Sequence, residues 1–169
     1  MTAANTFKND IQTWLIKNGF GKLGIDFAED FQYVILQTGE FGISIGIQAQ
    51  PKLGRYFEQF LYEYGLEYCG IFDPVLLFLH EVGHHMTYDC FTSSEKSLYN
   101  ITKQFSHSEY EQERLDQYWS IPDEFAANMW EIEFINNHID AVEELCQIYV
   151  IDWMTLCAEM DVWDLIEEG

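Results

Sequence analysis

Residues 74–89 read PVLLFLHEVGHHMTYD and contain an H-E-x-x-H string at positions 80–84. Residues four apart share one face of an α-helix, so His80 and His84 would point both imidazoles at one metal ion. Glu81 lies one step around the helix, close to the metal but not over it. That place suits a general base acting on zinc-bound water. The string predicts a zinc site; the alternative is a pair of core histidines beside a solvated glutamate.

The residues around the string favour a buried helix. Pro74 suits a first helical turn, and Asp73 before it is a good N-cap. Positions 75–79 and 82 are all apolar, as expected of a helix that is enclosed by a core. Gly83 costs about 1 kcal/mol of helix stability relative to alanine. Its presence therefore indicates that another segment passes close to this point.

A catalytic zinc ion takes three protein ligands, so a third ligand is needed. Residues 120–128, SIPDEFAAN, begin a second predicted helix, and Glu124 in its first turn is the candidate. Ala127 is small enough to let this helix pack closely on the first. Asn128, one turn beyond Glu124, could support a ligand by a hydrogen bond, as could Asp89. The alternative is that Glu124 only complements the helix dipole.

The two motifs, His80-Glu81-x-x-His84 and Glu124-x-x-Ala127-Asn128, resemble those of the ImmA/IrrE family of zinc peptidases, a gluzincin-type branch found in bacteria, phages and other mobile elements. The resemblance covers roughly residues 74–135. It implies one Zn²⁺ per chain on the two histidines and Glu124, with Glu81 as the base. It also implies that the substrates are transcriptional repressors or related regulators, cut at specific sites.

Peptide hydrolysis would also need a donor for the oxyanion of the transition state. The candidates in the sequence are Tyr88, His107 and Tyr110. His85 is a weaker candidate, because helix geometry turns it about 100° away from His84. Each of these residues could instead be an ordinary surface or core residue.

Composition predicts a single globular domain. The chain has 169 residues, of which 48% are apolar and 17% aromatic, enough for a sizeable core. No apolar run reaches the length of a membrane span, so no membrane association is expected. The first ten residues lack the basic-then-apolar plan of a signal peptide. We therefore expect a cytoplasmic protein of a bacterium or a phage-infected cell.

The formal net charge is −21, and no lysine or arginine follows Arg114. Such a charge disfavours direct binding of nucleic acid and attracts basic partners. A basic repressor is therefore a fitting protein substrate. Two other readings stay open: the charge could serve solubility alone, or the chain could be an acidic phage-type binding or inhibitor protein on an inactive metallopeptidase scaffold. Such an inhibitor would act as a DNA mimic or on a host factor. The sequence does not indicate an oligomeric state.

The apolar patterning predicts an α+β fold, a mainly helical zincin-like domain with a small antiparallel sheet packed on the H-E-x-x-H helix. The segment from 91 to 119 is weakly patterned and reads as an insert, a lid or a substrate-selecting loop, with one short helix near 109–119. The strand over residues 41–48 is a candidate edge for pairing with an extended substrate. The remaining elements are predicted as helices over 5–18, 52–68, 122–138 and 139–167, and strands over 25–27 and 31–37.

Overall fold

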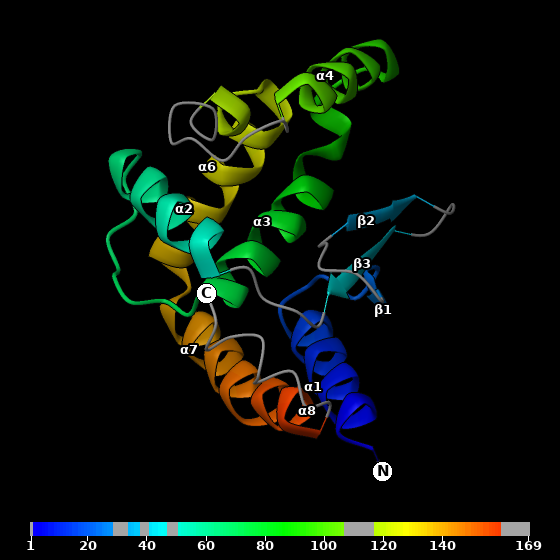
Figure 1. Ribbon diagram of the computed structural model, residues 1–169, viewed down its shortest axis with the longest axis vertical. Helices are drawn as coiled ribbons and strands as arrows, with labels where there is room; N and C mark the ends of the chain where they lie inside the picture. The colour runs from blue at the N-terminus through cyan, green and yellow to red at the C-terminus, as the bar shows by residue number, and fades with distance from the viewer. Residues whose placement is uncertain (1, 29–33, 38–40, 47–50, 107–116, 160–169) are drawn as a thin grey trace. The chain divides into compact units, whose positions relative to one another are not determined.

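The computed structural model describes residues 2–28, 34–37, 41–46, 51–106 and 117–159, and these are mostly helical (Figure 1). The prediction of a mainly helical chain is confirmed. No helix in the described ranges has both the length and the apolarity to cross a lipid bilayer. The helical elements are α1 (Ala3–Lys17), α2 (Pro51–Glu63), α3 (Asp73–Thr87), η1 (Tyr88–Cys90), α4 (Ser93–Ser106), α6 (Pro122–Asn137), α7 (Ile139–Ile148), the π-helical η2 (Tyr149–Trp153) and α8 (Met154–Glu159).

The chain divides into two compact units. One unit joins residues 1–50 to residues 138–169, and the other is continuous from 51 to 137. All three predicted zinc ligands lie in the continuous unit. A single domain over all 169 residues stays a prediction.

The first unit contains a three-stranded sheet in the order β1-β3-β2. The strands are β1 (Gly24–Ala28), β2 (Val34–Gln37) and β3 (Phe41–Gly46). β2 and β3 form the predicted antiparallel pair, but β1 pairs with β3 in parallel, so the prediction of a purely antiparallel sheet is wrong. β3 is also not an edge strand, because it has a partner on each side. The packing of this sheet on the H-E-x-x-H helix stays a prediction.

The helices of the first unit bury apolar residues that recur at helical spacing. Ile11, Trp14 and Leu15 of α1 are buried, and so are Val142 and Leu145 of α7. The indole nitrogen of Trp14 donates a hydrogen bond of 2.8 Å to the carbonyl oxygen of Ala141. Packing of these two faces closes the core of this unit without the predicted zinc ligands.

In the second unit, α3 lies against α6 (Figure 1). α3 begins with Phe72 as the N-cap residue, which has no side-chain cap, so the prediction of Asp73 as N-cap is wrong. Asp73 is instead the first helical residue, where its charge complements the helix dipole. Pro74 lies in the first turn, as predicted. Within α3, the apolar side chains before His80 are buried except that of Leu77, which is half-buried.

The predicted insert contains a regular helix, α4, where only a short helix farther along the chain was expected. Thr92 and Glu95 start α4 with a capping box. The backbone nitrogen of Glu95 donates to Thr92 Oγ1 at 3.3 Å, and the backbone nitrogen of Thr92 donates to Glu95 Oε2 at 2.8 Å. The sequence did not predict this helix because its apolar pattern is weak. In the structure its apolar residues Leu98 and Ile101 are 59% and 52% exposed, so they do not form a buried face. The predicted helix near 109–119 falls mostly on residues outside the described ranges.

Candidate metal centre

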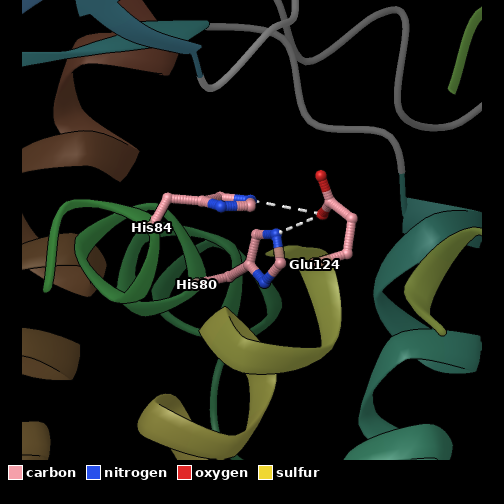
Figure 2. Close-up of side chains that lie close together, drawn as sticks. All are labelled: His80, His84 and Glu124. Atoms are coloured by element: carbon pink, nitrogen blue, oxygen red, sulfur yellow. Dashed lines mark hydrogen bonds and ion pairs between the residues drawn. The ribbon is translucent and has the colours of Figure 1, made fainter. Parts of the chain in front are cut away.

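Two helices bring three potential ligands to one point (Figure 2). His80 and His84 come from α3, and Glu124 comes from the first turn of α6. Nε2 of His80 lies 2.9 Å from Oε2 of Glu124, and Nε2 of His84 lies 3.2 Å from the same oxygen. One ligand atom from each residue lies within 4.8 Å of the other two. The predicted triad is thus assembled as a group that could hold a metal ion.

A close approach of the two helix backbones makes this assembly possible. A Cβ atom placed on Gly83 would lie 2.6 Å from the carbonyl oxygen of Ala127, which is too close for any side chain. Gly83 lies between the two histidines, and Ala127 lies one turn after Glu124. The expectation that a glycine here marks a passing segment, and that small residues let the helices pack closely, is confirmed.

Asn128 orients His80. Its Oδ1 lies 2.7 Å from Nδ1 of His80, while its Nδ2 donates to the backbone oxygen of Trp119 at 3.4 Å. Because an amide oxygen can only accept, Nδ1 of His80 carries the proton and donates it. When the ring is neutral, its lone pair is therefore on Nε2, facing Glu124, as a metal ligand requires. Phe57 of α2 holds the other side of the ring, with an edge contact at 5.4 Å between centroids.

The donor set fits zinc. Two imidazole nitrogens and one carboxylate oxygen are a ligand set of catalytic zinc sites. Ligand atoms about 2.0–2.1 Å from a tetrahedral ion lie about 3.3 Å apart, close to the two contacts with Oε2. With the proton of His80 on Nδ1, its Nε2 and the carboxylate oxygen are two acceptors in contact. Such a pair is stable only with a proton or a cation between them.

The other oxygen of Glu124 has partners that sequence reasoning missed. Lys103 of α4 forms an ion pair with Oε1, and the Tyr118 hydroxyl donates to Oε1 at 3.3 Å. The ammonium of Lys103 also lies 2.6 Å from Oδ2 of Asp123. One signal in the sequence could have led to Lys103. The Thr92-x-x-Glu95 capping box predicts the helix that carries it.

The two glutamates of the motifs have opposite electrostatics. Burial of the Glu124 carboxyl would raise its pKa, but the charges and hydrogen bonds of His84 and His80 outweigh burial and hold the pKa well below its ordinary value. Burial raises the pKa of half-buried Glu81 to about 8; the charge of His80 opposes this shift and that of Glu124 adds to it. Glu124 is therefore ionised like a ligand, whereas Glu81 can both take up and release a proton near neutral pH.

A second buried glutamate, Glu131, lies two turns beyond Glu124 on α6. It is fully buried, and neither of its carboxylate oxygens has a hydrogen-bond partner within the described residues. Burial, together with the charge of Glu81, raises the pKa of Glu131 well above its ordinary value. Folding therefore favours the protonated form of Glu131, and no pattern in the sequence indicates this.

The predicted accessory residues are less well placed. Tyr88 is half-buried in η1, with the ammonium of Lys96 3.1 Å from its ring centroid. Asp89 is exposed in the same turn. His107 and Tyr110 lie outside the described residues. A role for any of these four residues stays a prediction, whereas Asn128 has the ligand contact expected of it.

No protein-family model, curated protein or solved structure matches this chain. The resemblance to zinc peptidases therefore depends on the two motifs, and the metal site depends on its own geometry.

Proposed function

We propose that this protein is a zinc-dependent endopeptidase that cleaves a regulatory protein. The observation that carries the proposal is the convergence of His80, His84 and Glu124 within 4.8 Å, with Glu81 next to the first ligand. A site that held zinc only for stability would be closed by a fourth protein ligand. Within the described residues the site has three ligands, which would leave a position for water or substrate. The side chain of His84 is 16% exposed, so water or substrate could enter beside it.

Each residue of the site then has a role. Bound at the triad, zinc would act as a Lewis acid toward a peptide carbonyl and toward water. Glu81 would take a proton from the attacking water and pass it to the leaving amine, since it is adjacent in the chain to the first ligand, His80. Among the described residues, Tyr118 places a phenol hydroxyl on Glu124. Burial and the charges of Glu124 and Glu81 raise the pKa of Tyr118, so it keeps its proton and can donate a hydrogen bond.

The proposed substrate is a basic protein, such as a DNA-binding repressor. This part of the proposal rests on the net charge of −21, which attracts basic partners and speeds their approach at low salt. Cleavage of such a partner should therefore slow as ionic strength rises. Cleavage of a neutral peptide should change much less.

The test compares the wild-type chain with Glu81→Gln. Both should bind about one zinc ion per chain after reconstitution at neutral pH, because Glu81 is not a ligand. Only the wild type should cleave a peptide library prepared from a bacterial proteome, with products read by mass spectrometry. A chain that holds no zinc, or a Glu81→Gln variant that cleaves as fast as the wild type, would end this proposal.

The charge favours a second candidate, an acidic binding or inhibitor protein on an inactive metallopeptidase scaffold. Such a protein would form stable complexes with a basic protein, and these would survive Glu81→Gln and Glu124→Gln unchanged. A pull-down that uses the wild type and both variants separates the candidates. An endopeptidase should release a cut partner, and only its inactive variants should retain an intact one.

A further inference from the structure

Lys103 approaches Glu124 on the side that faces away from the histidines. Its ammonium pairs with Oε1 of Glu124 and lies 2.6 Å from Oδ2 of Asp123. The Lys103 side chain is only 16% exposed, and that of Asp123 only 15%. Lysines are rarely buried this far without a specific pairing, since removing the ammonium from water is costly. The buried pairing indicates a function beyond that of a surface ion pair.

The two oxygens of the Glu124 carboxylate have different partners. Oε2 faces His80 and His84, whereas Oε1 is taken by Lys103 and by the Tyr118 hydroxyl. A carboxylate can bind a metal ion through one oxygen or through both. Here the second oxygen is already engaged by a cation, which a metal ion would have to displace.

We infer that Lys103 is a positioning residue that commits Glu124 to bind the metal ion through Oε2 alone, and that its charge weakens metal binding. The inference rests on the proposed zinc site. Its consequence is that one coordination position stays free of the second carboxylate oxygen. The Lys103 ammonium, on the other oxygen of the Glu124 carboxylate, also offsets part of the negative charge of this ligand. The metal ion therefore remains a stronger Lewis acid.

The expected effect on affinity follows from Coulomb's law. A unit charge about 5–6 Å from a divalent ion, screened as in water, opposes binding by about 10-fold, and weaker screening in a buried site makes the effect larger. Removing the charge should therefore tighten metal binding by about 10-fold or more. Removal would also free Oε1 to join the coordination, which acts in the same direction.

The experiment uses the full chain, with Zn²⁺ in competition against a chelator and Co²⁺ as a spectroscopic probe. In Lys103→Met we expect tighter Zn²⁺ binding and a weaker visible Co²⁺ absorption, because five-coordinate Co²⁺ absorbs less than four-coordinate Co²⁺. Lys103→Arg keeps the charge and the hydrogen bonds, so it should restore both wild-type values. If Lys103→Met does not fold by circular dichroism, Lys103→Gln should still show the tighter Zn²⁺ binding.

The matched control is Lys96→Met, which removes the same charge from the same helix. Lys96 lies over the Tyr88 ring rather than on Glu124, so its variant should bind both metals as the wild type does. Equal affinities and equal spectra in Lys103→Met and the wild type would overturn the inference while leaving the zinc site intact. So would weaker binding in Lys103→Met. A wild type that binds neither metal would overturn the proposed function as well.

Discussion

Two glutamates on α6, seven residues apart, are both buried but differ in their contacts and in the direction of their pKa shifts. Glu124 is 2% exposed and Glu131 is 0% exposed. Glu124 contacts two imidazoles, an ammonium and a phenol, while Glu131 has no hydrogen-bond partner within the described residues. The pKa of Glu124 is held low, and that of Glu131 is raised. Partners, rather than depth in the core, decide which buried carboxyl is charged and able to hold a cation.

The largest expected effect comes from exchanging the two carboxyls for amides, one at a time. Glu124→Gln removes a ligand and should weaken Zn²⁺ binding by more than the roughly 10- to 100-fold that an outer-shell change costs. Glu131→Gln is the matched control on the same helix and should leave the affinity within about 2-fold of the wild type. Competition with a chelator measures both. If the two variants lose affinity equally, the distinction between the two glutamates is wrong.

Asn128→Ala should have the next largest effect. It leaves Nδ1 of buried His80 without its acceptor, which makes His80 resemble Glu131 as a buried group without a partner. We expect a loss of about 10-fold or more in Zn²⁺ affinity. Asn128→Asp keeps an acceptor at the same place and should bind more tightly than Asn128→Ala. An unchanged affinity in Asn128→Ala would mean that the imidazole needs no orientation.

Glu131→Leu should stabilise the chain by on the order of 1 kcal/mol at neutral pH, because it removes a buried carboxyl without partners. The raised pKa of Glu131 means that the folded state favours the protonated form. Its stabilising contribution is present below the unfolded-state value and is lost as the pH rises through the folded-state value. The advantage of the variant should therefore grow with pH in urea unfolding. Glu133→Leu, at an exposed position of the same helix, is the control and should change little.

The smallest expected effect concerns Asp152, a carboxyl in the unit formed by residues 1–50 and 138–169, whose pKa is also set by its surroundings. Burial, a hydrogen bond with Asp10 and the charge of Asp10 raise the pKa of Asp152 to about 6. The stabilising contribution of protonated Asp152 is complete below about pH 4 and is lost as the pH rises through 6. Asp152→Asn should therefore stabilise at pH 8 by less than about 1 kcal/mol, since partly exposed charges are screened, and by less still at pH 5. Thermal unfolding at the two pH values measures this; an advantage that is larger at pH 5 would contradict it.

The triad could be predicted from sequence because its geometry is local. Helical periodicity alone places His80 and His84 together, and the small residues after Glu124 indicate the helix that packs on them. The order of the strands could not be predicted in this way. Pairing of β1 with β3 depends on contacts between residues far apart in the chain, and a short strand has no preference for parallel or antiparallel neighbours in its own residues.

The contacts of Lys103 and the burial of Glu131 could not be predicted from the hydrophobic pattern of the sequence. Lys103 is on a helix whose apolar pattern is weak and whose start is encoded mainly by its cap. Glu131 is polar yet fully buried, because the close crossing of α3 and α6 at Gly83 sets which residues of α6 face inward. Neither the reach of a lysine nor a crossing point of two helices follows from periodicity.

The most direct test of the metal centre is X-ray absorption spectroscopy of the zinc-loaded chain. The triad predicts two imidazole nitrogens and at least one oxygen at about 2.0–2.2 Å from the zinc ion. The same spectrum of Glu124→Gln should lose part of the oxygen contribution. A sulfur shell at about 2.3 Å, or fewer than two imidazoles in the wild type, would contradict a site built from His80, His84 and Glu124.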